Sequence, residues 1–358
     1  MVLLLSMSFA QVLDATREVP MASGVHLAMG RTGIAWAHGP TGLFQNPAAP
    51  AIRTLENRSL WSVQGTASMS TVVEASGVDL GTLGIEDQWS GLDALAGASV
   101  GYRNGAGGVV VSRSGRRAGG ARITVRETHA TGSWARRDGC CAFGVGYRGL
   151  AVGSEGEQAY AYSGSALQFG GTFYQEGLTL GAVLRLPVRA EPVGDPVEGL
   201  PATAVKPLEV GLGLAWRGVG PWTGLPTRFA FDLVARAPTE GLSQEAATFG
   251  LVDVGLTGAG PVAWGLGPRV GLELEPRPDV LRVRGGAWVQ MPDLALASPT
   301  MHLTGGVQVK LLTLRVRGWE KPLSVSTAFD VSDGYREISW LSLGFWDSGA
   351  VGVPWTSL

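Results

Sequence analysis

Charged residues, cysteine and lysine are all scarce in this 358-residue sequence. Charged residues make up 16% of the chain, against roughly 25% in an average soluble domain. Two cysteines exclude a disulfide-rich scaffold and a four-cysteine zinc site. A net charge of −2 gives no electrostatic reason to expect a nucleic-acid partner. Only three of the 28 basic residues are lysines, so arginine carries almost all of the positive charge.

Long uninterrupted hydrophobic runs are also missing. A membrane-spanning helix needs about 20 mostly apolar residues, and the uncharged stretch 32–52 is broken by glycines and prolines. Residues 1–10 form a short apolar run that ends in Ser8-Phe9-Ala10, where the small residues suit signal peptidase. We therefore expect residues 1–10 to be a signal peptide, with its usual basic start missing as in a truncated leader.

Glycine and two-residue alternation are abundant. The chain has 54 glycines, and in 208–217 and 228–236 apolar side chains alternate with small or charged ones. Such alternation places the two kinds of side chain on opposite faces of a strand. Most of the alternating segments exceed the ~5–6 residues usual for soluble sheets and match the ~9–11 residues of a tilted membrane strand. Strand length therefore favours a sheet that spans a membrane.

Fifteen segments fit such strands. They are residues 60–70, 95–104, 107–114, 120–131, 140–149, 158–171, 176–188, 206–217, 226–236, 247–258, 262–275, 279–291, 301–317, 322–331 and 335–346. Because bacterial single-chain barrels have even strand numbers, one of these segments is in excess. We predict an all-β fold, a transmembrane antiparallel β-barrel of about 14 strands, with 12 to 16 open. A soluble β-sandwich or propeller is the alternative fold.

The barrel prediction divides the chain into four parts. Residues 1–10 are the signal peptide, 11–59 an N-terminal hatch or plug inside the lumen, 60–346 the barrel, and 347–358 a C-terminal tail. The hatch is expected because residues 24–51 are rich in glycine and do not alternate. The proline-rich segment 187–207 is expected to be a long surface loop, because proline cannot donate a hydrogen bond to a sheet.

The hatch region also carries a family resemblance. The run Met29-Gly30-Arg31-x-Gly33-x-Ala35, followed by Asn46-Pro47-Ala48-Ala49, resembles the N-terminal hatch of the FadL/PorV-like outer-membrane barrels. The resemblance implies a 14-stranded barrel with an internal hatch. In the transporters of this superfamily a hydrophobic ligand passes the hatch and leaves sideways into the membrane. The hatch positions carried over to this chain are Gly30, Gly33, Asn46, Pro47 and Ala48.

Arginines and one aspartate are the candidate lumen-lining residues. Alternation predicts that they point inward, where charge in a confined interior requires a partner. Structural ion pairs are one interpretation, and binding of an anion or a carboxylate is the other. The candidates are Arg126, Arg217, Arg228, Asp232, Arg282, Arg284 and Arg315.

No residue pattern predicts catalysis or a bound cofactor. The Gly144–Gly149 match to G-x-G-x-x-G lies inside a strand segment, and the four histidines lack metal-ligand spacing. We therefore expect that the protein is not an enzyme, has no catalytic or metal-binding residues and needs no cofactor.

Two functions remain open for such a barrel. The first is a scaffold or accessory subunit of an envelope machine for secretion, surface attachment or motility, with protein partners in the envelope. The second is a FadL-like, porin-like transporter or channel for a hydrophobic or small anionic compound. Both place the chain in a Gram-negative outer membrane with lipid around it, and neither involves nucleic acid.

Overall fold

The computed structural model describes twelve stretches of the chain. They are residues 23–52, 61–75, 88–118, 121–136, 140–155, 160–194, 203–221, 223–237, 264–290, 299–316, 319–332 and 335–345. The predicted signal peptide and the C-terminal tail lie outside these residues.

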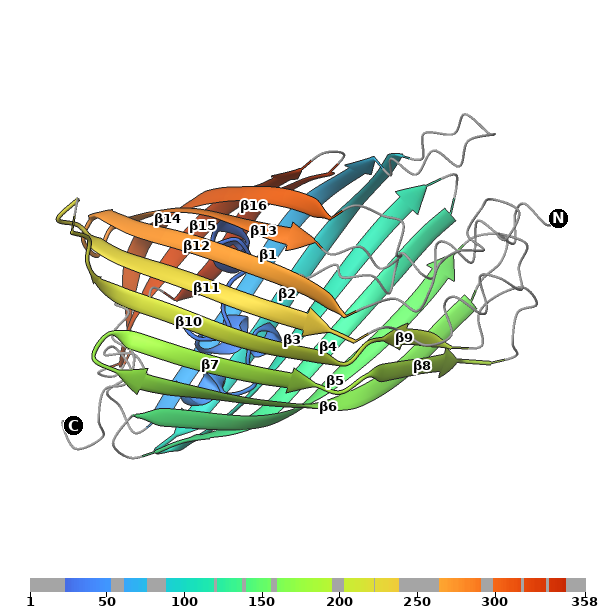
Figure 1. The fold of residues 1–358 in the computed structure, drawn as a ribbon, viewed down its shortest axis with the longest axis horizontal. Coiled ribbons are helices and arrows are strands. Elements are labelled where there is room, and N and C mark those ends of the chain that lie inside the picture. The colour runs from blue at the N-terminus through green and yellow to red at the C-terminus, as the bar shows by residue number, and fades with distance from the viewer. Residues whose placement is uncertain are drawn as a thin grey trace.

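The strands form one closed antiparallel sheet (Figure 1). β1 pairs with β16 as well as with β2, and β5 pairs with β6, so every strand of the ring has two neighbours. β8 continues β7 and β9 leads into β10, so the 16 strands make a 14-strand barrel, which confirms the predicted fold and strand number. The bounds are β1 Trp61–Ala75, β2 Gln88–Tyr102, β3 Gly105–Ala118, β4 Ala121–Ala135, β5 Cys141–Glu155, β6 Tyr160–Gln175, β7 Leu178–Arg185, β8 Val188–Pro192, β9 Ala204–Lys206, β10 Glu209–Val219, β11 Pro226–Arg236, β12 Gly265–Arg277, β13 Leu281–Gln290, β14 Thr300–Val316, β15 Trp319–Ser332 and β16 Tyr335–Phe345.

Fourteen of the fifteen predicted segments coincide with these strands of the barrel. The remaining segment, 247–258, lies outside the described residues. The barrel closes without it, because β11 pairs directly with β12 from Thr227↔Leu274 to Arg236↔Gly265.

The prediction of a loop over residues 187–207 is wrong in part. β8 and β9 pair with each other from Val188↔Lys206 to Ala190↔Ala204, and β8 also pairs with β6. The pairing is interrupted only beside Pro187 and Pro207, which lie opposite each other and have no N–H to donate. We call this place the proline break.

The two faces of the wall differ in chemistry. Along β7 exposed and buried residues alternate without exception, with Leu178, Leu180 and Leu184 exposed and Thr179 and Arg185 buried. Large apolar side chains are exposed on strands all around the barrel, whereas most buried side chains on the strands are small, polar or charged. Since hydrocarbon and not water suits such an outer surface, the barrel is built to stand in a membrane. No helix in the described stretches is long and apolar enough to cross a membrane.

The ends of the barrel carry different connections. The connections after β2, β4, β6, β10, β12 and β14 meet at one end, and each is six residues or shorter. The longest connections, 76–87, 193–203, 237–264 and 291–299, join strands at the other end. We call the first the short-turn end. In outer-membrane barrels short turns face the periplasm and long loops face the exterior.

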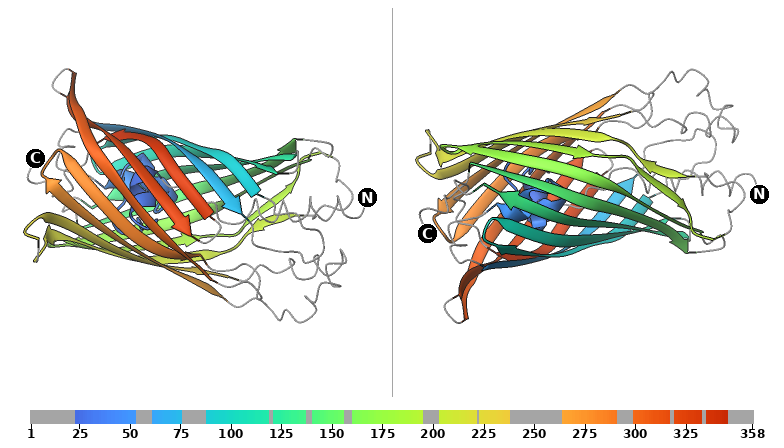
Figure 2. Two further views of the ribbon diagram at one scale, coloured as in Figure 1. Left: turned by 90° about the horizontal axis from the view of Figure 1, so that it is seen from above. Right: turned by 90° about the horizontal axis from the view of Figure 1, so that it is seen from below.

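Residues 23–52 lie inside the barrel (Figures 1 and 2), and we call them the inner segment. They contain the helix α2 Gly24–Ala28 and the 3-10 helices η1 Pro40–Phe44 and η2 Ala49–Ala51. α2 contacts β14 and β15, while η1 and η2 contact β3 and β4 on another part of the wall. The inner segment therefore crosses the lumen from one side to the other.

Candidate functional site

Close backbone packing is the first feature that seats the inner segment in the barrel. Gly30 has a φ of 62°, and a Cβ there would lie 2.2 Å from the carbonyl oxygen of Val270. On the wall, a Cβ on Gly144 would lie 2.1 Å from the carbonyl oxygen of Pro47, and one on Gly181 would lie 2.3 Å from that of Ile34. Glycine is needed on both partners because their backbones are almost in contact.

The Asn-Pro-Ala run forms the second anchor. The Asn46 side-chain amide donates to the carbonyl oxygens of Ile34 at 2.8 Å and of Gly171 in β6 at 3.1 Å. Its oxygen accepts the N–H of Ala48 at 3.0 Å, and both Asn46 and Ala48 are fully buried. Pro47 packs against Gly144 and Gly170. Asn46 thus ties two parts of the inner segment to each other and to the wall.

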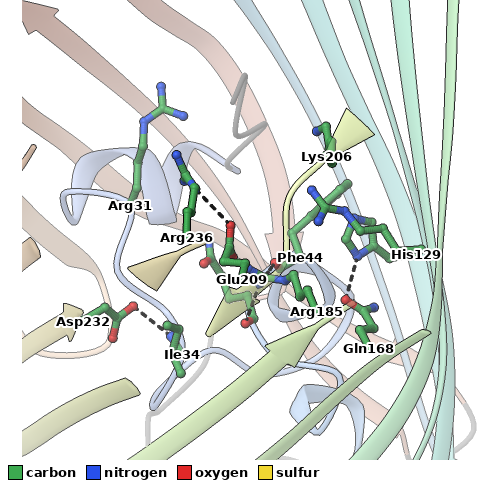
Figure 3. Close-up of polar contacts among 12 residues, drawn as sticks. Arg31, Ile34, Phe44, His129, Gln168, Arg185, Lys206, Glu209, Asp232 and Arg236 are labelled. Carbon is green, nitrogen blue, oxygen red and sulfur yellow. Dashed lines mark hydrogen bonds and ion pairs between the residues drawn. The ribbon is translucent and has the colours of Figure 1, made fainter. Parts of the chain in front are cut away.

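Asp232 on β11 is the third anchor. One of its carboxylate oxygens accepts the backbone N–H of Gly33 at 2.7 Å and that of Ile34 at 3.0 Å, and the side chain is fully buried. Figure 3 shows this carboxylate pointing at the inner segment. The two N–H groups have no helical partner, so the carboxylate of the wall satisfies donors that would otherwise be buried and unpaired.

Arg31 provides a fourth anchor on the opposite wall. Its guanidinium contacts Asp330 on β15 at 3.1 Å and Glu337 on β16 at 2.7 Å, and it lies 4.7 Å from the centre of the Trp288 ring. Asp330 also accepts from Trp288 Nε1 at 2.9 Å and contacts His302 Nδ1 at 2.9 Å. One buried carboxylate therefore organises arginine, tryptophan and histidine side chains from three elements.

A second group of charged residues lies beside the proline break (Figure 3). Arg185 on β7 forms an ion pair with Glu209 on β10, and it also donates to the carbonyl oxygens of Phe44 and Gln45 of the inner segment. Glu209 contacts Arg236 at 3.3 Å. Arg185 thus connects the wall at the break to the inner segment.

Three arginines gather near the short-turn end. Arg228, Arg282 and Arg284 each lie within 4 Å of Glu273, at 3.5, 3.8 and 2.6 Å, and Arg282 also lies 3.7 Å from Glu275. All five side chains are buried. Glu273 therefore brings three guanidinium groups of the wall together.

A cavity opens between this cluster and the inner segment. Its lining includes Arg228, Arg282, Arg284, His26, Trp36 and Gln308. Burial lowers the pKa of His26 to about 3, with further lowering by the charges of His38, Arg284 and Arg228. His26 is therefore neutral at neutral pH, and its Nδ1 lies 2.9 Å from the hydroxyl of Ser23.

The structure places most of the predicted lumen residues inside and corrects one of them. Asp232, Arg228, Arg282 and Arg284 are buried on the inner face, and Arg217 is half-buried opposite Arg228 in the next strand. The side chain of Arg315 lies outside the described residues. The prediction for Arg126 is wrong, because that residue is exposed on the outer face while its neighbours on β4 are buried.

Sequence reasoning missed several residues of the interior. They are Arg31, Glu273, Asp330 and Glu337, which meet one another or the arginines of the wall only after the barrel closes. Alternation alone offered a signal for Glu273, which is two residues from Glu275 and shares its face. Among the described residues no group of histidine, cysteine, aspartate and glutamate side chains has the arrangement of a metal site.

Comparison with known proteins adds information on the fold. No family model matches the sequence, and no curated protein matches it. The fold is similar to that of a TodX deltaS2S3 mutant monoaromatic hydrocarbon channel, with a TM-score of 0.61, 11% identity, and coverage of 92% of this chain and 99% of that one. It is similar to the Ralstonia pickettii toluene transporter TbuX, with a TM-score of 0.58 and 11% identity over 92% of this chain and 98% of that one. It is also similar to a Pseudomonas aeruginosa FadL homologue, with a TM-score of 0.55 and 12% identity over 91% of this chain and 97% of that one.

These similarities cover nearly the whole of each chain, and two of the three structures are a hydrocarbon channel and a toluene transporter. The predicted resemblance to FadL-type barrels is confirmed at the level of the fold. By its fold the chain is a FadL-like β-barrel, and its apolar outer wall is consistent with the outer membrane in which such barrels stand.

Proposed function

We propose that this protein is an outer-membrane channel for small hydrophobic compounds. The observation that carries the proposal is the combination of a closed 14-strand barrel with a buried segment that crosses its lumen. Two proteins of similar structure are a monoaromatic hydrocarbon channel and a toluene transporter, and the similarity covers over nine-tenths of this chain.

The channel reading is better supported than the scaffold reading. The expected role in secretion, surface attachment or motility rests on the PorV-like half of the resemblance, and no similar structure reported above is a secretion or motility subunit. The scaffold reading requires protein partners, whereas the channel reading requires only a ligand and the membrane.

In the proposed channel the inner segment acts as the hatch expected over residues 11–59, of which residues 23–52 are described. It lies across a straight path, since Arg31 holds it to one wall and Asn46 holds it to the opposite wall. We place the sideways exit at the proline break, where the described wall lacks backbone pairing. Arg185 links that break to Phe44, so movement of the inner segment and opening of the break are connected.

Uptake of toluene by intact cells tests the proposal. A Gram-negative host without a hydrocarbon channel is given the full-length gene, and accumulation of radiolabelled toluene is compared with that of arabinose, a polar solute. We expect toluene uptake to rise severalfold over the empty vector while arabinose uptake stays unchanged. Unchanged toluene uptake from a barrel that is folded in the outer membrane would overturn the proposal. Stoichiometric protein partners recovered in mild detergent would then favour the scaffold.

A further inference from the structure

The only two cysteines of the chain, Cys140 and Cys141, are neighbours at the start of β5. Neighbouring side chains in a regular strand point to opposite faces of the sheet. Here β5 begins at Cys141 and Cys140 lies in the bend before it, so the pleat of the strand does not separate the two side chains. Their Sγ atoms lie 3.5 Å apart, and both residues are in the thiol form. The two sulfurs therefore already form a contact pair.

Hydrogen bonds to the wall fix the backbone of this pair. The carbonyl oxygen of Cys140 accepts the N–H of Tyr174 in β6 at 2.7 Å, and that of Cys141 accepts the N–H of Arg136 at 2.9 Å. Cys141 also lies opposite Phe173 in the pairing of β5 with β6. Both cysteines are half-buried, as reactive cysteines usually are. The short distance between the sulfurs is therefore a property of the folded wall.

Exposed aromatic residues show where the pair lies relative to the lipid. Trp134 on β4 is opposite Phe143 on β5, and both are exposed on the outer face. Trp61 and Tyr102 form a second exposed aromatic pair at the same end of the barrel. Such side chains gather at the boundary between lipid and water. Cys141 is two residues nearer to the short-turn end than Phe143, about 7 Å along the strand, so the pair lies on the water side of this boundary.

The compartment at this end favours oxidation of thiols. In outer-membrane barrels the short turns face the periplasm, where disulfides form and persist. Exchange of one thiol with a disulfide gives a mixed disulfide, and a second thiol within reach resolves it. Because the chain has two cysteines in all, each is the only thiol of the chain that can resolve a mixed disulfide on the other.

We propose that Cys140 and Cys141 are a modification site for disulfide-bearing oxidants and form a reversible disulfide with each other. The thiolate of one cysteine attacks a sulfur of the oxidant R–S–S–R, forms a mixed disulfide and releases one R–SH. The other cysteine attacks the mixed disulfide, closes the bond between Cys140 and Cys141 and releases the second R–SH. The cysteines lose two electrons and two protons, and both leave with the two R–SH molecules.

The bond is expected to be reversible because the two residues are adjacent. Consecutive Cα atoms are about 3.8 Å apart, closer than the roughly 4.4–6.8 Å usual in disulfides, and strained disulfides are reduced more readily. The proposal goes beyond the channel function and does not depend on it.

Reaction of the purified, reduced full-length barrel with oxidised glutathione tests the proposal. Trypsin cuts after Arg137 and Arg148, so one peptide, residues 138–148, carries both cysteines for mass spectrometry. We expect two molecules of reduced glutathione to be released per chain and the peptide to hold an internal disulfide with no bound glutathione. Excess reduced glutathione is expected to restore both thiols.

Cys140→Ser and Cys141→Ser are the matched controls. Each keeps one thiol without a resolving partner, so each is expected to retain one bound glutathione. If a serine variant fails to fold, the result for the native barrel is still decisive.

Three results for the native barrel would overturn the proposal. They are glutathione retained on either cysteine, a disulfide-linked dimer on a non-reducing gel, and two thiols that stay unreacted. Cells quenched with acid and alkylated before reduction show the state of the pair in the envelope. We expect the internal disulfide there, and alkylation of both thiols before reduction would overturn its formation in the cell. None of these results bears on toluene uptake, so failure of this site and failure of the channel function are separate outcomes.

Discussion

Replacement of Asp232 by alanine should release the inner segment from the wall of the barrel. In the native protein the Asp232 carboxylate accepts the N–H groups of Gly33 and Ile34 at 2.7 and 3.0 Å, and it is fully buried. Alanine removes the acceptor and leaves both N–H groups buried between the inner segment and β11. The strand itself keeps its backbone pairing with β10 and β12.

The size of the effect follows from the two lost acceptors. A buried donor left without a partner costs about 1–3 kcal/mol, so two donors cost about 2–6 kcal/mol. This energy destabilises the docked inner segment relative to the released one, while the other anchors, including Arg31, remain. Even the lower value raises the population of the released segment by about 30-fold, since 1.4 kcal/mol is a factor of ten.

Limited trypsin cleavage after Arg31 measures the released population. Arg31 is 1% exposed in the docked segment, so trypsin reaches it only after release. When opening and closing are fast compared with cleavage, the cleavage rate follows the population of the open state. We therefore expect the Asp232→Ala barrel to be cut after Arg31 at least about 30 times faster than the native one.

Asp232→Asn is the matched control. Its amide oxygen can still accept the two N–H groups, but without charge, so we expect a cleavage rate between those of the native protein and Asp232→Ala. Migration of unheated samples on gels shows whether the barrel itself stays folded. A cleavage rate after Arg31 in Asp232→Ala equal to the native rate would refute the assigned role of this carboxylate.

Three further predictions concern the contacts of the inner segment and the wall of the barrel. Gly144→Val should displace the inner segment and speed cleavage after Arg31 at least tenfold, because a Cβ there would lie 2.1 Å from the carbonyl oxygen of Pro47. Gly132→Val should not change the cleavage rate, because a Cβ there meets nothing within 4 Å. Migration of unheated samples on gels shows whether both barrels are folded. The double substitution Pro187→Val and Pro207→Val restores two N–H donors, so amide exchange near the break should slow and toluene uptake should fall severalfold; unchanged uptake would place the exit elsewhere. His26 has a folded-state pKa of about 3, below its usual 6.5. In the released segment His26 takes up a proton at a higher pH than in the docked one, so docking should weaken as pH falls from 6.5 towards 3. Cleavage of the inner segment by an acid-active protease should therefore accelerate over this range, and it should accelerate less in His26→Phe.

The number of strands in the barrel could be predicted from the sequence because the alternation of side chains is a local property. A two-residue period requires no knowledge of neighbouring strands, and fourteen of the predicted segments coincide with the barrel strands. The loop predicted over residues 187–207 is longer than the break in pairing that the structure shows. Each proline removes one hydrogen-bond donor but leaves the neighbouring residues free to pair. Local chemistry therefore gives strands more reliably than it gives their limits.

Alternation does not say which face is inside when neither face is apolar. On β4 one face carries Glu127, His129 and Thr131 and the other carries Arg126, Thr128 and Ala130, so hydrophobicity did not decide between them, and Arg126 was assigned to the wrong side. On β11 the aromatic residues Phe229 and Phe231 mark the lipid face, and Asp232 was assigned correctly to the interior.

The sequence by itself determined that this chain forms long alternating strands with an apolar face for lipid and a polar face for the lumen. Only the tertiary structure decided which interior groups meet. Asp232 contacts residues about 200 positions away, and Arg31 contacts residues about 300 positions away. Such contacts depend on the register and closure of all fourteen strands, and no local pattern specifies them. For the same reason, the cavity between His26 and Arg284 exists only in the closed barrel.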